Sequence, residues 1–333
     1  MVNIASIRQY NARFASEQHR GWVGVLSGAT GGIGAGTLTR MVQNLHDSTF
    51  YVLGRSEARF ASQKAELMKL NPTNKIVFLN AQVSLLRDVD TACEQIKKAE
   101  NKVDFVYMSP GVDMGTALLK GPQYTEESLE QSFAISYYGR LRLVSSLLPL
   151  LRNSQSPRVL SVLNGGREET INTEDPGLEK TWSVLRVGAH TTTMTALALE
   201  HLAAEDSNHG ITFLHAFPGI VKTDIINRLT PPTDSSTGLG WRVGLAAFRG
   251  VGSVVMGLFG MEVQDCGDRQ AYLLTSDATI PQPGAWRFDA SSEVIKTEGV
   301  LKRYREDALG KRVWEHTEGV FNRCVVDAST GAE

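Results

Sequence analysis

The chain has 333 residues, of which 42% are hydrophobic, and this is enough for a substantial buried core. Its 34 Lys and Arg against 36 Asp and Glu give a net charge of -2, which argues against the basic field that binds a nucleic-acid backbone. The three cysteines, Cys93, Cys266 and Cys324, have neither disulfide nor metal-ligand spacing, so we expect a reducing compartment, the cytoplasm.

The first residues carry an amphipathic pattern. Ile4, Ile7 and Phe14 fall on one helical face, which predicts a short helix docked before the first strand. The segment has no apolar core followed by a cleavage site, so we expect no secretory signal.

Short apolar runs then alternate with helical patterns. Runs typical of strands occupy residues 22–26, 50–53, 76–79, 103–108, 159–163, 211–217 and 285–288. Between them, residues 35–45, 126–151 and 183–204 are helical in pattern, the last two with apolar residues at spacings of three and four. The alternation predicts an α/β fold, a doubly wound parallel sheet flanked by helices.

We expect a single domain over residues 1–333, because no composition break or linker separates a second one. It divides into a core at 21–225, a substrate lid at 226–262, the last helix and strand of the core at 263–290, and a charged helical tail at 291–333. The apolar stretch 238–260 is long enough to span a bilayer. Arg242, Arg249 and its glycines favour a lid over an apolar substrate instead of a membrane span.

Residues 27–34, SGATGGIG, directly follow the first strand and precede a helical run. Glycines let backbone N–H groups approach a pyrophosphate, and the positive end of the helix favours its charge. A tight turn alone would also use glycine, but the strand, turn and helix context favours a dinucleotide-binding loop. The loop residues expected at the cofactor are Gly28, Thr30, Gly32, Ile33 and Gly34.

The second strand ends in YVLGRSEAR and has no acidic residue at its tip. Arg55 stands there instead, and a guanidinium suits the 2′-phosphate of NADP(H), whereas an acidic residue would suit the free ribose of NAD. The alternative is that Arg55 is only a solvated loop charge.

Several motifs resemble those of the short-chain dehydrogenase/reductase family, which has a single Rossmann-type domain. SGATGGIG is similar to the family's TGxxxGIG loop, and MSPG at 108–111 stands where the family has NNAG. RVLSVLNGG at 158–166 is similar to the strand that carries the family's catalytic serine. FPGIVKT at 217–223 is similar to the family's Pro-Gly motif, which lies beside the nicotinamide. The phrases VSLLRDVDTACEQIKKAE, ISYYGRLR and HTTTMTALALEHLA look most like fungal members of secondary metabolism. The resemblance implies cofactor contacts from Gln82, Val83, Ser109, Pro110, Gly111, Pro218, Gly219, Val221 and Thr223, with Gln82 where the family usually has an adenine-contacting Asp.

The family's proton relay of Asn, Ser, Tyr and Lys does not match. Ser136 stands where Asn is expected, and Asn164, or alternatively Leu163, where Ser is expected. In one register Trp182 replaces Tyr and Arg186 replaces Lys, on one helical face; in the other the pair is Ser183 and Val187. We favour the first, because Arg186 would keep a cation for the nicotinamide ribose, although the Trp182 indole cannot exchange a proton.

Other residues are candidates for the chemistry. Tyr137 or Tyr138 could exchange a proton, although buried helix tyrosines are more often packing residues. Asp113 is either a site residue or an exposed turn aspartate, and we expect His190 to be structural, since it lies far along the helix. Asn164 could polarise a carbonyl without exchanging a proton.

Three functions remain open. The first is NADPH-dependent reduction of a hydrophobic carbonyl or iminium, the latter needing no proton donor. The second is a non-redox cyclase or isomerase, in which the pocket holds a reactive conformer. The third is a catalytically inactive NADPH-binding protein. For each we expect a hydrophobic small molecule or NADP(H) as the partner, and a homodimer stays possible.

Overall fold

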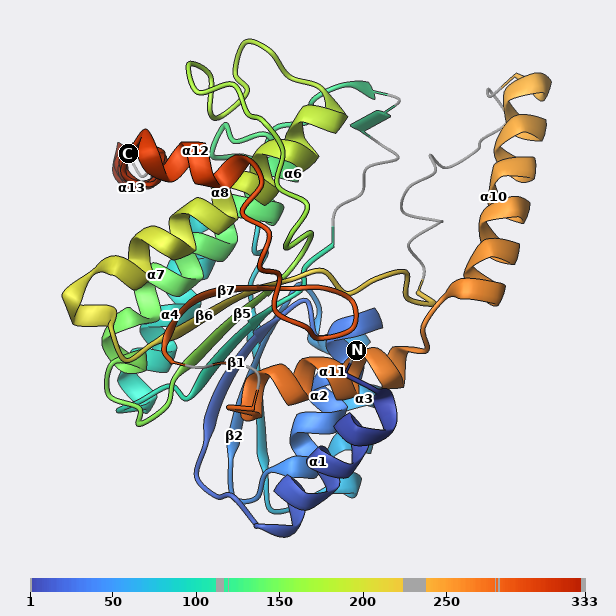
Figure 1. The fold of residues 1–333 in the computed structure, drawn as a ribbon, viewed down its shortest axis with the longest axis vertical. Coiled ribbons are helices and arrows are strands. Elements are labelled where there is room, and N and C mark those ends of the chain that lie inside the picture. The colour runs from blue at the N-terminus through green and yellow to red at the C-terminus, as the bar shows by residue number, and fades with distance from the viewer. Residues whose placement is uncertain are drawn as a thin grey trace.

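A computed structural model describes residues 2–111, 117–118, 120–223, 238–278, 280 and 282–330. Seven parallel strands form one sheet in the order β3-β2-β1-β4-β5-β6-β7 (Figure 1). Their bounds are β1 Val23–Ser27, β2 Thr49–Gly54, β3 Lys75–Asn80, β4 Phe105–Met108, β5 Arg158–Val162, β6 Thr212–Ala216 and β7 Gly284–Phe288. The chain therefore reverses its direction of winding between β1 and β4, where doubly wound sheets bind their ligands.

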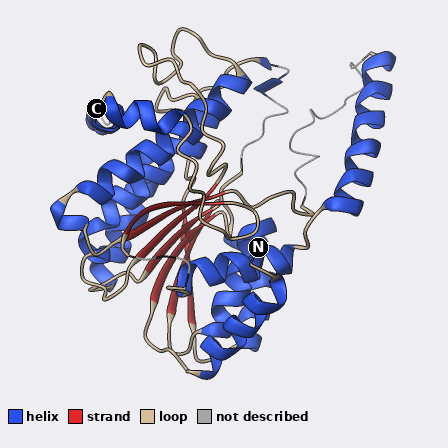
Figure 2. Ribbon diagram, viewed as in Figure 1, coloured by secondary structure: helices blue, strands red, loops and turns tan. Residues whose placement is uncertain are grey.

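One face of the sheet is covered by helices α1 (Ile4–Ser16), α2 (Gly32–Asn44), α3 (Glu57–Leu70) and α11 (Val263–Thr275). Ile7 and Phe14 are buried in this layer, which confirms the amphipathic reading of the N-terminus. The Asn3 side chain accepts a hydrogen bond from Ala5 N and fixes the start of α1. Figure 2 shows these helices gathered on one side of the sheet.

The other face is covered by α4 (Leu86–Ala99), α7 (Gly139–Leu151) and α8 (Val184–Ala204). Alternate side chains of each strand serve the two layers, so Val25 packs here and Leu26 on the opposite face. The C-terminal α12 (Val300–Glu306) and α13 (Leu309–Thr330) add Leu301, Trp314 and Phe321 to this layer. These two helices begin at Val300, after a non-helical stretch, and their apolar side chains pack into the core.

All seven expected strands are present, with their ends shifted by one or two residues. The helix expected over 126–151 is interrupted. It is divided into α6 (Gln131–Phe133), a π-helical turn at Ala134–Tyr138, and α7. Such turns shift the side chains that follow, and they are frequent at functional sites.

The expected lid contains helix α10 (Leu239–Phe259), which stands away from the sheet in Figure 1. No helix within the described residues is long and apolar enough to cross a membrane. The segment 224–237, which would connect a lid to the core, lies outside the described residues, so closure over a substrate stays a prediction.

Candidate functional site

The carboxyl ends of the strands bring the predicted motifs to one edge of the sheet. The phosphate loop follows β1, Arg55 follows β2, Ser109 follows β4, Asn164 follows β5 and Pro218 follows β6. The Ser109 hydroxyl donates to the carbonyl oxygen of Gly28 at 3.3 Å, so the loops after β4 and β1 are in direct contact. Loops at this edge form the ligand crevice of doubly wound sheets.

The phosphate loop needs glycine for two separate reasons. Gly28 has φ 77°, and a Cβ there would lie 2.4 Å from the backbone N of Pro110. A Cβ at Gly34 would lie 2.2 Å from the carbonyl oxygen of Gly28, so only glycine allows α2 to pack this close. By contrast, a Cβ at Gly31 would meet nothing within 4 Å, so the space above the loop is open.

The start of α2 fits a bound anion. Its N-cap, Gly31, provides no side-chain hydrogen bond, and the first turn has no acidic residue. The backbone N–H groups and the positive end of the helix dipole are therefore left for a ligand. Together with the close glycine packing, this makes the loop suitable for the pyrophosphate of a dinucleotide.

The Pro-Gly motif after β6 lies beside this loop. A Cβ at Gly32 would lie 3.4 Å from Cγ2 of Thr223, and Gly219 has φ 79°. Val221 is buried and forms a parallel bridge with Met261, which follows α10. Thr223 is thus placed where it can approach a molecule held by the phosphate loop.

Arg55 is exposed and makes no ion pair with another described residue. It follows Gly54, whose position lies close to Thr30, since a Cβ there would be 3.1 Å from Thr30 Cγ2. Arg55 and the loop therefore share one region of the edge, as NADP(H) binding would require.

The loop after β3 packs against the start of α7. Gln82 donates its backbone N–H to Asp88 and its amide to the Ser84 hydroxyl, at 2.8 and 3.2 Å. A Cβ at Gly139 would lie 1.9 Å from the carbonyl oxygen of Val83, which explains the glycine of ISYYG. Gln82 and Val83 are both partly exposed at the ligand edge, while Ile33 is half-buried in α2, and Gly111 is exposed.

A pocket of about 70 Å³ lies next to this edge. Its lining comes from α6, the π-helical turn, the end of β5 and the start of α8: Ser132, Ser136, Leu163, Asn164, Trp182, Val184, Val187, Gly188 and Thr191. The structure thus brings together Ser136, Asn164 and Trp182 among the residues predicted for catalysis. Complete ligand pockets measure roughly 300–1,000 Å³, so the cavity suits the reacting end of a ligand.

The lining can be compared with the two registers considered for the start of α8. Val184, Val187, Gly188 and Thr191 face the pocket, at the spacings of one helical face. Arg186 is exposed and donates from Nη1 to the carbonyl oxygen of Thr181 at 2.8 Å. Arg186 is not among the residues that line the pocket, whereas Trp182 of the same register is. The lining thus contains one residue of each proposed pair, Trp182 and Val187, and the register stays a prediction.

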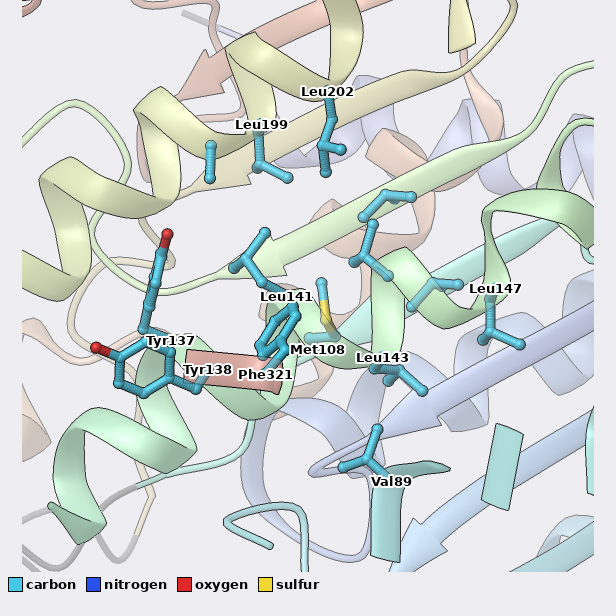
Figure 3. Packing of buried hydrophobic residues seen from close by; sticks show 14 of the residues in the cluster. Val89, Met108, Tyr137, Tyr138, Leu141, Leu143, Leu147, Leu199, Leu202 and Phe321 are labelled. Carbon is cyan, nitrogen blue, oxygen red and sulfur yellow. The ribbon is translucent and has the colours of Figure 1, made fainter. Parts of the chain in front are cut away.

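Tyr137 and Tyr138 also lie outside the pocket. The Tyr137 hydroxyl is 2.6 Å from Oγ1 of Thr317, and that of Tyr138 is 2.8 Å from Nε2 of His316, both on α13. Burial raises the pKa of both phenols. Figure 3 shows the two rings in the buried cluster with Phe321. Their placement does not support proton exchange with a substrate, because the π-helical turn directs Ser136 to the pocket and both rings to α13.

The loop before α8 holds Trp182 in place through a buried acid and a histidine. The Asp175 carboxylate accepts hydrogen bonds from the backbone of Glu179, Lys180 and Thr181 and from the Thr181 hydroxyl. His190 accepts from Asn172 N and donates to the Pro176 carbonyl, both at 3.0 Å, so it is structural, as predicted. Asp113 lies outside the described residues.

Two site residues were missed by the sequence reasoning. The fully buried Arg140 guanidinium donates to the carbonyl oxygens of Met108, Pro110 and Val162 and to the Ser161 hydroxyl, at 2.9 to 3.2 Å. It thereby joins the ends of β4 and β5 beneath the pocket, and burial lowers its pKa to about 10. An arginine within the apolar run YYGRLRLVSSLL was the available signal.

The second is Glu130, which precedes α6 and is 7% exposed. Its Oε2 accepts from the backbone N of Phe133 at 2.7 Å, whereas Oε1 is buried without a partner among the described residues. The indole Nε1 of Trp182 is also buried without a partner. Within the described residues no group of His, Cys, Asp or Glu side chains could hold a metal ion.

Comparison with known proteins agrees with this geometry. The family model for short chain dehydrogenases matches residues 23–167. The oxidoreductase lepF of Aspergillus flavus is 36% identical, with 99% of each chain covered, and the oxidoreductase AN1596 of Emericella nidulans is 32% identical, with 98% of this chain and 99% of the relative covered.

Among solved structures, an L-sorbose reductase from Gluconobacter frateurii, in complex with NADPH and L-sorbose, superposes with a TM-score of 0.60 at 14% identity. The match covers 84% of this chain and 98% of that one, and it concerns the fold alone. Full-length similarity to fungal oxidoreductases, the matched family model and the glycine-lined edge lead to one conclusion: the chain belongs to the short-chain dehydrogenase/reductase family.

Proposed function

We propose that the protein is an NADPH-dependent reductase of a hydrophobic carbonyl or iminium compound in natural-product biosynthesis. The observation that carries the proposal is the pocket in which Asn164 and Ser136 lie among apolar walls, beside an edge suited to a dinucleotide. The unpaired Arg55 supports NADPH over NADH. Fungal oxidoreductases that are similar to this chain over nearly its whole length support a biosynthetic enzyme.

The residues of the pocket can bind and orient a carbonyl. The Asn164 amide is a hydrogen-bond donor that can stabilise negative charge on the substrate oxygen, and Ser136 offers a second donor in the cavity lining. Leu163, Val184 and Val187 exclude water, which strengthens these interactions. When bound, the cofactor supplies a hydride.

No lysine is among the described residues that line the pocket, and in this the site differs from the family's usual Tyr and Lys pair. Val187 offers no cation to a nicotinamide ribose or to a neighbouring phenol. A charged iminium needs no proton when it receives a hydride, so its reduction requires no proton donor in this site. A carbonyl demands a proton from another residue.

The experiment is incubation with extracts that contain hydrophobic carbonyls and imines, with NADPH deuterated at the transferred position. We expect loss of NADPH absorbance together with a product that has gained one deuterium, and in addition one proton where the substrate is a carbonyl. Asn164→Ala should lower the rate of this conversion about 10²-fold, as loss of one oxyanion donor does in other enzymes. Products without deuterium and without NADPH consumption would refute the reductase.

A second function, a non-redox cyclase or isomerase, is favoured by one observation: apart from Trp182, the described lining consists of aliphatic, amide and hydroxyl groups, with no titratable side chain. A pocket of this kind can hold a reactive conformer by shape and hydrogen bonding. Conversion to a product of equal mass, undisturbed by removal of the cofactor, would identify this function.

A further inference from the structure

The pocket has a buried carboxyl group directly behind its wall. Glu130 lies two residues before the pocket residue Ser132, and only 7% of Glu130 is exposed. The contact of Oε2 with Phe133 N fixes the direction of the carboxyl group. Its second oxygen, Oε1, has no hydrogen-bond partner in the part of the chain that the structure describes. A buried, unpartnered carboxyl oxygen is costly, so it calls for an explanation.

The surroundings of Glu130 favour a proton on this carboxyl group. Burial raises the pKa of Glu130 and is the largest influence on it. The pKa is lowered by nearby hydrogen-bond donors: the backbone N–H groups of Phe133 and Ser132, the Ser132 hydroxyl and the Trp182 indole. The groups that face it from α6 and from the loop before α8 are thus uncharged. Arg186, in the first turn of α8, is exposed and bonded to Thr181. Ser132 and Trp182 both face the carboxyl group and line the pocket, although neither forms a hydrogen bond of good geometry with Oε1.

We propose that Ser132 and Glu130 form the proton-transfer pair of the pocket, in place of the family's tyrosine. Ser132 would contact the substrate oxygen, and Glu130 would supply the proton from behind. The proposal deepens the proposed reductase function and rests on it for the source of the hydride. It removes the restriction to iminium substrates, because a carbonyl can then be protonated.

The step balances as follows for a carbonyl. The carbon gains a hydride from the dinucleotide, and the carbonyl π electrons move onto the oxygen. The Ser132 O–H bond breaks as a new O–H bond forms on that oxygen, and Ser132 Oγ takes the proton of the Glu130 carboxylic acid. Glu130 is left as a carboxylate and regains its proton from water after the alcohol leaves.

The other polar residues of the pocket are less suited to this role. The Asn164 amide does not exchange a proton, so it can only stabilise the charge. Ser136 and Thr191 line the cavity, but the Thr191 hydroxyl already donates to the Val187 carbonyl at 2.7 Å. Of these hydroxyl residues, Ser132 is the one close enough to the buried Glu130 carboxyl group to affect its pKa.

The first test is independent of turnover. Infrared difference spectra between the wild type and Glu130→Gln should show the band of a protonated carboxyl group. We expect the band to persist above the pH at which ordinary glutamates, with a pKa of 4.5, ionise. Gln retains the acceptor for Phe133 N, so the start of α6 is preserved. A carboxyl group that ionises at or below the ordinary pH would overturn the proposal.

The second test is kinetic and uses a carbonyl substrate. Glu130→Gln and Ser132→Ala should each lower kcat about 10²- to 10³-fold with little change in KM, the usual range for loss of general acid catalysis. Ser132→Thr should restore much of the rate. Ser145→Ala is the matched control, since its hydroxyl donates to the Arg142 carbonyl within α7, and it should behave as the wild type.

Three further outcomes separate this proposal from its rivals. If Trp182→Phe, which removes the indole N–H, reproduces the loss in Glu130→Gln, the carboxyl group only orients Trp182 and the proton pair is overturned. If both variants keep the wild-type rate of NADPH consumption, the pair is overturned while the reductase stands. If the wild type consumes no NADPH with any carbonyl, the reductase fails, and the infrared titration alone decides the state of Glu130.

Discussion

The Tyr138 hydroxyl lies 2.8 Å from Nε2 of His316, and this contact joins the helix beside the pocket to the C-terminal helix α13. Thr317, one residue further along α13, makes the equivalent contact with Tyr137. The tail therefore stabilises the π-helical turn that presents Ser136 to the pocket. Two tyrosines that could have been proton donors instead hold the site together.

Tyr137→Phe and Tyr138→Phe should leave cofactor binding and product formation unchanged. Each removes one buried hydroxyl and its hydrogen bond to α13, so the free energy of unfolding should fall by about 1–3 kcal/mol. The loss should be smaller for Tyr137→Phe, because the Thr317 hydroxyl keeps its bond to the Val313 carbonyl. Urea unfolding followed by circular dichroism would measure this loss. A folded variant that loses turnover but keeps its stability would indicate that the missing phenol takes part in catalysis.

Arg55→Ala and Arg186→Ala should differ in their effect on NADPH. Arg55 is positioned for a 2′-phosphate, and its loss should raise the Kd for NADPH about tenfold or more, a cost of about 1.4 kcal/mol, with the Kd for NADH unchanged. Arg186 bonds to Thr181 at the surface, so its replacement should leave both values unchanged.

Calorimetric titration of both variants with both cofactors provides the comparison. Weaker NADPH binding in Arg186→Ala alone would support the register that places Arg186 at the nicotinamide ribose. Equal losses for NADPH and NADH in Arg55→Ala would mean that Arg55 does not distinguish the two cofactors.

Arg140→Met should be strongly destabilising, by about 3–5 kcal/mol, because the carbonyl oxygens of Met108, Pro110 and Val162 would lose a buried donor. Arg142→Met, two residues along the same helix, is the matched control. Its guanidinium pairs with Asp90 where both side chains are partly exposed, so we expect a loss of about 1 kcal/mol. Similar unfolding midpoints for the two variants would contradict the role assigned to Arg140.

The fold could be predicted because the central strands β1, β4, β5 and β6 are buried along their whole length and therefore form continuous apolar runs separated by helical periods. The phosphate loop was equally readable, since Gly28 and Gly34 are required by backbone contacts that no other residue permits. Requirements of this kind restrict a position to glycine, so they can be predicted from the sequence.

The catalytic pocket was less predictable, because it depends on a change of helical register. An uninterrupted helix over 126–151 gives no indication that a π-helical turn directs Tyr137 and Tyr138 to α13. The choice between Arg186 and Val187 likewise depends on where α8 begins, and Ser183 caps it by accepting from Arg186 N. Glu130 escaped notice because its burial results from packing between distant segments.

His215 gives a prediction for acid stability. It lies on β6 with both ring nitrogens buried and without a hydrogen-bond partner, and Glu168 Oε1 is 3.8 Å from Nδ1. Burial lowers the pKa of His215 to about 3, and the nearby Arg140 and Arg287 add to the effect. The unfolded chain, with an ordinary pKa of 6.5, therefore binds a proton more readily than the folded one.

The free energy of unfolding should therefore be independent of His215 protonation above pH 6.5. Below that pH it should fall as the pH approaches 3, by at most about 1.4 kcal/mol per pH unit, because protonation of His215 favours the unfolded chain. His215→Leu removes the titrating group, so urea unfolding between pH 7 and 4 should show a shallower decline than in the wild type. His209→Gln, at an exposed position, should keep the wild-type decline. If His215→Leu lost stability as steeply as the wild type, the acid sensitivity would have to come from other groups, and Glu168 would be the first to replace.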